Sequence, residues 1–315
     1  MTSVAAELRD LGLHYGMRAL PTEACSALGA WLGTKLGQSA HPVSDSRARA
    51  LIARLRPDLA VSPAALEASL RLLWQNVGRT YAEFAAIQRM LPEGRALLSG
   101  QERLDAAYAD DRPLILCFVH LGNWEVLGQQ VTAHPLVHRG RPISAVVMPP
   151  ANRAHAFIVA RRRSTLPVDL IPMGRRVWHV VAQTLRRPGG IVWLAGDEVA
   201  NGHVCAPHFG RKPRIDGNLG KIVRLAATTG ARILPVYNER IGSVRFHSHV
   251  LPMLDMPSGR LDDEEIRTQV MRIDAVFAPI VRRLVTQWHM ATQFGIDDGI
   301  TVPVAAERSE MEMHA

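Results

Sequence analysis

From residue 113 onward, short apolar runs alternate with helical stretches, and this alternation constrains the fold of the chain more than any other feature. Short apolar runs bounded by turn residues are typical of buried strands. Alternation of this kind predicts an α/β fold, a mixed, mostly parallel sheet flanked by helices. We expect strands at 114–119, 143–148, 168–171, 191–194 and 233–237, an edge strand at 244–250, and helices near 124–133, 152–163, 175–186 and 217–229.

Long helices are expected on both sides of this region. Ser62 and Pro63 begin one of them, because a serine side chain caps a first turn and proline suits the first helical position. Apolar residues recur at three- to four-residue spacing over 66–84, and the break at Pro92 ends the helix. The acidic run 262–265 begins another helix, whose dipole favours negative charge in its first turn.

The N-terminal region is expected to form a helical cap on the sheet domain. No apolar segment reaches the roughly eighteen uncharged residues that a bilayer-spanning helix needs. Residues 24–34 are uncharged, rich in small side chains and followed by Lys35. This segment suits two arrangements equally: a helix in the membrane interface with Trp31 at headgroup level, or a helix packed on the sheet domain.

The formal net charge of +8 calls for an anionic partner. Nucleic acid, an acidic membrane surface and an acidic carrier protein all fit such a charge. The sequence contains no recognisable nucleic-acid-binding module, and aromatic residues make up only 5% of it, which is sparse for stacking on bases. We therefore rank the membrane surface and an acidic carrier protein above nucleic acid.

Neither a disulfide framework, a metal nor a cofactor is expected. The three cysteines, Cys25, Cys117 and Cys205, show no paired spacing, which favours a reducing compartment. Histidine and cysteine gather at 203–208 and 247–249 but match no zinc spacing. Dinucleotide fingerprints, P-loops and the G-x-S-x-G elbow of serine hydrolases are absent from the sequence.

A histidine stands at the end of the first apolar run. His120 follows Val119, and Glu125 lies five residues further on. A strand that ends here places the imidazole at the edge of the sheet, and a tight turn through Gly122 can bring the carboxylate back toward it. A carboxylate that holds one ring nitrogen as N–H leaves the other free to take a proton from a hydroxyl. This chemistry allows an alcohol to attack a thioester.

The stretch His-Leu-Gly-Asn-Trp-Glu at 120–125 resembles the His-x4-acid signature of the glycerolipid acyltransferase superfamily. Its longer form is similar to that of the lipid A late acyltransferases, which include lauroyl and myristoyl transferases and their mannoside acyltransferase relatives. The apolar run that ends at Asp197, the turn at 207–210 and the pair Gln287-Trp288 resemble later blocks of the same family. The resemblance covers almost the whole chain in order.

The chain departs from the family pattern at two places. Glu198 and Val199 stand where the family has an amide or histidine and then a second acid, and His208 replaces the first Phe of an aromatic pair. Both places adjoin the acceptor pocket that the resemblance implies. These departures therefore affect the expected identity of the acceptor more than the expected type of reaction.

The first motif carries the roles that the resemblance implies for catalysis. His120 would be the general base and Glu125 the carboxylate that orients it. Asn123 and Trp124 would shape the turn and the wall of a substrate-binding site. The tetrahedral intermediate needs N–H donors, for which the backbone amides of Gly122 and Asn123 are candidates.

Three further residues lie outside that motif. The family carries an arginine between its blocks, which implies that Arg163 assists at the site. Asp197 matches the acid of the second block, which implies a role in acceptor binding or site geometry. Arg240, just beyond a predicted strand, suits a phosphate contact or a surface salt bridge equally.

We therefore expect an O-acyltransferase on the cytoplasmic face of the inner membrane, peripheral or anchored by its N-terminus. Its donor would be acyl carrier protein or, as second choice, acyl-CoA, and its acceptor a hydroxyl of an anionic membrane glycolipid such as a lipid A precursor. The alternatives are a mannosylated or aminoacyl lipid acceptor, or a catalytically silent lipid-binding scaffold. The expected division is a helical membrane-associating segment at 1–44, a single α/β acyltransferase domain at 45–304 and a tail at 305–315.

Overall fold

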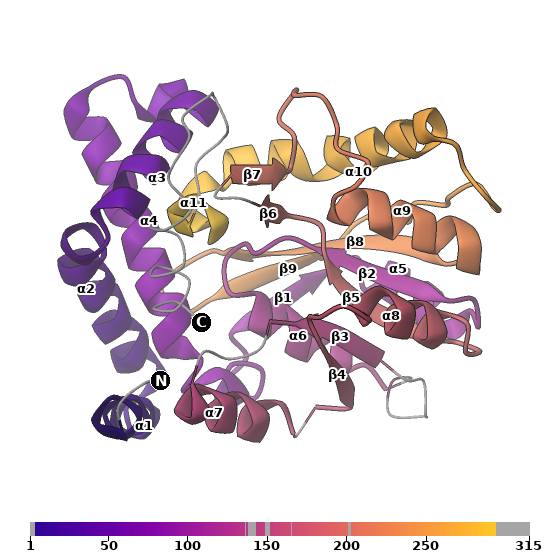
Figure 1. Ribbon diagram of the computed structural model, residues 1–315. Helices are drawn as coiled ribbons and strands as arrows, with labels where there is room; N and C mark the ends of the chain where they lie inside the picture. The colour runs from indigo at the N-terminus through magenta and orange to yellow at the C-terminus, as the bar shows by residue number, and fades with distance from the viewer. Residues whose placement is uncertain are drawn as a thin grey trace.

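The computed structural model describes residues 4–135, 137, 143–148, 152–164, 166–200 and 203–293, so the expected tail at 305–315 lies outside the described residues. Its centre is a seven-stranded sheet in the order β1-β9-β8-β2-β5-β3-β4 (Figure 1). The strands are β1 (Ala96–Ser99), β2 (Leu114–Phe118), β3 (Ile143–Val147), β4 (Val168–Pro172), β5 (Ile191–Ala195), β8 (Arg232–Arg240) and β9 (Phe246–Val250).

Five neighbouring strands of this sheet, from β8 to β4, run parallel to one another. Strand β9 runs antiparallel to β8, and β1 pairs parallel with β9. The mixed, mostly parallel α/β sheet predicted from the sequence is therefore confirmed. A separate antiparallel hairpin, β6 (Glu198–Ala200) and β7 (His203–Ala206), follows β5 directly.

Helices cover both faces of the sheet, because alternate side chains of the strands point to opposite faces. On β2, Ile115 and Cys117 pack toward helices α8 (Val177–Leu185), α9 (Asn218–Thr229) and α10 (Asp263–Arg283). Leu114, Leu116 and Phe118 pack toward α5 (Gln101–Ala109) and α6 (Trp124–Thr132). Every residue of β2 is buried, which makes this strand the centre of the core.

The remaining helices gather at one end of the sheet (Figure 1). The described part of the chain, which ends at residue 293, also ends there. They are α1 (Val4–Ala19), α2 (Thr22–Ala40), α3 (Pro42–Leu55), α4 (Pro63–Glu83), α7 (Arg153–Arg163) and α11 (Met290–Gln293), with short 3-10 turns at Pro57–Leu59, Ile87–Arg89 and Val285–Gln287. Ser62 caps α4 as expected, accepting a hydrogen bond from the amide of Ala65. The helix ends at Glu83, earlier than the sequence predicts.

Helix α2 packs on α4 through glycines. A side chain at Gly33 would lie 2.1 Å from the carbonyl oxygen of Trp74, so only glycine allows this approach. The small-residue segment 24–34 therefore packs on a neighbouring helix, while Trp31 remains 57% exposed. In the described part of the chain, no helix is both long and apolar enough to cross a membrane.

Candidate active site

His120 and Asp197 meet because their strands are neighbours in register. Strands β2 and β5 are parallel, and Phe118 pairs with Ala195. His120 lies two positions after Phe118, and Asp197 lies two positions after Ala195. Both residues are therefore at the same carboxyl edge of the sheet. The amide of Gly196 donates to the carbonyl of Phe118 (2.6 Å), which continues the pairing up to the site.

The imidazole of His120 is held by Asp197. Nδ1 of His120 lies 2.7 Å from Oδ1 of Asp197, and the backbone amide of His120 donates to Oδ2 (2.9 Å). The indole N–H of Trp288 also donates to Oδ2 (2.9 Å). The Asp197 side chain is fully buried, whereas that of His120 is 20% exposed.

These contacts determine which nitrogen of His120 carries the proton. Burial opposes ionisation of Asp197, but the charge and ring hydrogen bond of His120, together with the donors from Trp288 and the His120 amide, hold its pKa below the ordinary 3.8. An ionised carboxylate only accepts hydrogen bonds, so Nδ1 of His120 is the donor. In the neutral form of the ring Nε2 then keeps a lone pair, and no hydrogen bond to it is present among the described residues.

The segment that carries Trp288 closes the site from the C-terminal side. The amide of Gly122 donates to the carbonyl of Gln287 (3.1 Å), and the amide of His289 donates to the carbonyl of His120 (2.9 Å). The side chain of Gln287 accepts from the amide of Arg240 (2.7 Å) and donates to its carbonyl (3.1 Å). The Gly122 amide, expected from the sequence as an oxyanion donor, is therefore already used in its hydrogen bond to the carbonyl of Gln287.

Glu125 does not occupy the position that the sequence assigns to it. Its Oε1 accepts a hydrogen bond from Nη2 of Arg163 (2.6 Å), and both side chains are about one-fifth exposed. Glu125 lies in the first turn of α6 and Arg163 in the last turn of α7. Because Asp197 binds Nδ1 of His120, the carboxylate that orients the histidine is Asp197 and the predicted role of Glu125 is corrected to holding Arg163.

Asn123 and Trp124 form the turn and the wall beside His120. The Asn123 side chain caps α6 by accepting from the amide of Glu125 (3.2 Å), which fixes the start of the helix. The ring of Trp124 meets that of His120 edge-on, with centroids 4.9 Å apart, and lies 5.0 Å from that of His289. The predicted substrate-binding roles of Asn123 and Trp124 stay predictions.

A buried ion pair that the sequence analysis did not identify supports this turn. Arg240 donates to both carboxylate oxygens of Glu83 at 2.7 and 2.8 Å, and their side chains are 4% and 0% exposed. Glu83 also accepts from Asn123 (3.0 Å) and from Ser26 of α2 (2.6 Å). Arg240 therefore forms a buried ion pair instead of the surface salt bridge considered from the sequence, and the phosphate contact stays a prediction. In the sequence, the only sign of this ion pair is the carboxylate of Glu83 at the end of the amphipathic stretch 66–84.

The two departures from the family pattern have structural partners. Glu198 accepts from the amide of Asn218 (2.8 Å) and so caps the start of α9. His208 is buried, and both its amide (2.6 Å) and its Nδ1 (3.0 Å) contact Oδ1 of Asp274 on α10. Its Nε2 accepts from the amide of Arg214 (3.1 Å), which makes the ring a brace for the loop between them.

A comparison of the sequence with protein-family models finds a match over residues 10–293 to the bacterial lipid A biosynthesis acyltransferases. The chain belongs to this family. Two curated relatives are phosphatidylinositol mannoside acyltransferases of Mycobacterium tuberculosis, from strains H37Rv and CDC 1551. Each is 26% identical over 199 residues, which cover 62% of this chain and 58% of the relative. The family expected from the His120 motif is thus confirmed.

No group of three or more metal-ligating side chains occurs in the part of the chain that the structure describes. The site instead consists of His120, the buried carboxylate of Asp197 and the ion pair between Arg163 and Glu125. Such an arrangement can move a proton between a hydroxyl and an imidazole.

Proposed function

We propose that this protein is an O-acyltransferase in which His120 acts as the general base. The observation that carries the proposal is the hydrogen bond between Nδ1 of His120 and Asp197, which leaves Nε2 as the basic atom on a partly exposed ring. Membership of an acyltransferase family supplies the class of reaction. The proposed acyl donor is a thioester of acyl carrier protein, with acyl-CoA as the alternative.

The reaction would proceed in two steps. Nε2 of His120 takes the proton of the acceptor hydroxyl while its oxygen attacks the thioester carbonyl, which forms the new C–O bond and a tetrahedral oxyanion. The C–S bond then breaks, the carbonyl returns, and the imidazolium gives its proton to the departing thiolate. Asp197 stabilises the imidazolium between the two steps, as a buried carboxylate beside a catalytic histidine does.

Arg163 is the residue that we propose for stabilising the oxyanion. A guanidinium carries five N–H donors, and the bond to Glu125 accounts for one of those of Arg163. Glu125 would hold the guanidinium at a fixed place beside the His120 motif. Preorganised donors of this kind lower the energy of developing negative charge.

The acceptor that we propose is a hydroxyl of a lipid A precursor, in keeping with the description of the family. A mannosylated lipid is the second candidate, because the curated relatives carry the name phosphatidylinositol mannoside acyltransferase. The fully formed His120–Asp197 pair argues against a catalytically silent scaffold, which has no need to hold Nδ1 in this way.

The cytoplasmic face of the inner membrane is the proposed location, since a lipid acceptor must be reached there. The net charge of +8 suits an anionic surface. Apolar side chains are exposed on α1 and α2, among them Leu8 (64%), Trp31 (57%) and Leu36 (55%). Such side chains suit contact with the membrane interface.

Mass spectrometry of total lipids tests this proposal. Lipids would be extracted from cells that produce the wild-type protein, the His120→Ala variant, the His179→Ala control or none. His179 is exposed on α8 and contacts Gln183 of the same helix, so its loss should change nothing. Loss of one acyl chain from lipid A in both the null and the His120→Ala cells is the expected result. Loss from a mannosylated lipid would replace the acceptor, and unchanged lipids would overturn the proposal.

A further inference from the structure

Trp288 holds Asp197 from a distant part of the chain. The Asp197 side chain accepts two hydrogen bonds from His120 and one from the indole of Trp288, which is 91 positions away in sequence. The His120 amide (2.9 Å) and the indole N–H (2.9 Å) both donate to Oδ2, whereas Oδ1 faces Nδ1 of His120. Because Oδ2 is held from two directions, the carboxylate is restrained from rotating and keeps Oδ1 toward the imidazole.

The position of Trp288 is fixed by backbone pairing with the His120 motif. Trp288 forms an antiparallel bridge with Leu121. The amide of His289, the next residue, donates to the carbonyl of His120 (2.9 Å). Trp288 is itself fully buried (0% exposed). The indole therefore cannot leave Asp197 unless this backbone pairing opens.

The ring of Phe209 contacts the indole of Trp288. The two rings meet edge-on, with centroids 5.9 Å apart and an angle of 74° between their planes. Phe209 has a φ of 52°, in the left-handed region that aromatic residues rarely adopt. A residue keeps such a conformation only where its surroundings impose it. The chain thus accepts local backbone strain at the residue that contacts Trp288.

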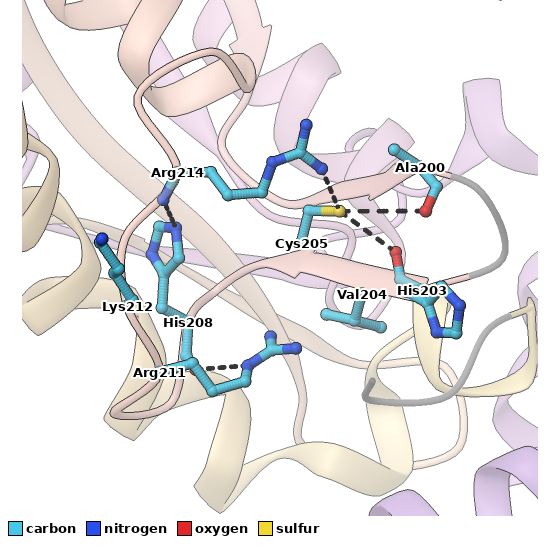
Figure 2. Close-up of a pocket in the computed structure, with 8 residues that line it drawn as sticks. All are labelled: Ala200, His203, Val204, Cys205, His208, Arg211, Lys212 and Arg214. Carbon is cyan, nitrogen blue, oxygen red and sulfur yellow. Dashed lines mark hydrogen bonds between the residues drawn. The ribbon is translucent and has the colours of Figure 1, made fainter. Parts of the chain in front are cut away.

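The loop before α9 is held at His208, next to Phe209. Nε2 of His208 accepts from the amide of Arg214 (3.1 Å), and its Nδ1 lies 3.0 Å from Oδ1 of Asp274 on α10. Figure 2 shows the first of these bonds and the guanidinium of Arg211, which donates to the carbonyl of His208 (2.8 Å). His208 is thereby held at its ring and at its carbonyl, so the position of the neighbouring Phe209 is fixed.

We infer that Trp288 is a positioning residue for the proposed acyl transfer, which acts through Asp197 and keeps the ring of His120 in the tautomer that leaves Nε2 basic. The inference rests on the proposed function for its reaction, but the tautomer of His120 can be measured without turnover. A hydrogen bond to a charged group contributes more than one between neutral groups. Replacement of Trp288 by phenylalanine removes this donor and keeps an aromatic ring against Phe209.

A second tryptophan provides a matched control within the same chain. Trp74 of α4 is also buried (4% exposed), and its indole N–H donates to Asp45 of α3 at 2.8 Å. Trp288→Phe and Trp74→Phe therefore each remove one buried indole and one hydrogen bond to an aspartate. Asp45 has no role in the proposed reaction, so a loss of activity that only Trp288→Phe shows is assigned to the bond with Asp197.

Steady-state kinetics of the full chain compare the two variants. Trp288→Phe is expected to lower kcat about tenfold with KM changed less than about twofold, because the lost bond restrains Asp197 and does not touch a substrate. Trp74→Phe should change kcat less than about twofold, although urea unfolding should show a similar loss of stability for both variants. Trp288→Phe added to Asp197→Asn should lower kcat no further, since Trp288 acts only through that carboxylate. Equal losses of kcat in the two single variants, or an additive loss in the double variant, would overturn the inference.

Nuclear magnetic resonance of the ring nitrogens in isotope-labelled histidine measures the tautomer directly. The His120 signals are identified by their loss in His120→Ala, at a pH where the ring is neutral. Wild type and Trp74→Phe should show Nδ1 protonated and Nε2 bare, and Trp288→Phe should show the two signals shifted toward each other as the tautomers mix. Unchanged signals in Trp288→Phe would overturn the inference. A wild-type chain that shows these signals but transfers no acyl group would show that the proposed function, not the placement of His120 by Trp288, is wrong.

Discussion

Asp197 accepts three hydrogen bonds at once, from the ring and the amide of His120 and from the indole of Trp288, and its carboxylate is fully buried. Because every one of these donors is fixed by the sheet or by the C-terminal segment, the carboxylate cannot turn away from the imidazole. In the proposed reaction, this geometry would orient the imidazole for proton transfer before any substrate binds. Its chemistry depends on the charge of Asp197 as well as on its position.

Asp197→Asn should abolish most of the activity while leaving the fold intact. The asparagine oxygen can accept from the His120 amide and Trp288, but its NH2 group then faces Nδ1 and forces the ring proton onto Nε2. The histidine would no longer be a base toward the substrate. We expect kcat to fall about 10³- to 10⁴-fold with a small change in KM. Steady-state kinetics measure this, near-UV circular dichroism controls for folding, and a loss below about tenfold would contradict the assignment.

The pKa of Asp197 also predicts a pH dependence of stability. In the folded chain this pKa lies below 3.8, so on acidification the unfolded chain takes up its proton first. The stabilisation from Asp197 is thus fully present above the unfolded pKa and is lost as the pH falls through the folded pKa. Urea unfolding of the wild type between about pH 6 and about pH 3 should show this decline, and Asp197→Asn should show a shallower one. Parallel curves for the two proteins would count against it.

Glu125 and Arg163 should behave as one unit in catalysis. Glu125→Gln and Arg163→Gln are each expected to lower kcat about tenfold or more. The first removes the charge that holds the guanidinium in place near the site, and the second removes the guanidinium itself. The double variant should be little worse than either single one, since paired residues are not additive. Arg161→Gln, an exposed neighbour on the same helix, serves as the control. Additive effects of the two substitutions would show that the pair does not act together.

The ion pair between Glu83 and Arg240 should matter for stability more than any surface pair. Arg240→Ala leaves the Glu83 carboxylate buried without its main partner, which costs about 3–5 kcal/mol of unfolding free energy. Arg49→Ala removes an exposed pair with Glu67, where both side chains are more than a third exposed, and should cost less than about 1 kcal/mol. Urea denaturation measures both changes. Similar costs for the two variants would mean that the buried pair has no special role.

The sequence predicts the strands of the parallel region well because each is a buried apolar run between turn residues. Predicted strands at 114–119, 143–148 and 191–194 correspond to β2, β3 and β5. It misses β1 and α5, which precede the alternation and carry mixed side chains. The hairpin β6–β7 is also missed, because its three- and four-residue strands are too short to show a period.

The candidate site shows where sequence reasoning reaches its limit. The His120 motif, Arg163 and Asp197 are all identified from the sequence, and the structure brings them to one edge of the sheet. Asp197 faces His120 because β5, and not β3, is the neighbour of β2 in the sheet. No local sequence pattern encodes that strand order. The sequence therefore predicts Glu125, which is close to His120 along the chain, as its partner, whereas Asp197 is 77 positions away.

Transfer of a radiolabelled acyl group from acyl carrier protein to purified lipid A precursor, by wild-type protein and by the His120→Ala variant, tests the central claim most directly. The account predicts that the wild type forms labelled lipid and that the variant, folded and still able to bind the lipid, forms it at least about a thousandfold more slowly. Acyl transfer by the variant at the wild-type rate would contradict the assignment of His120 as the general base.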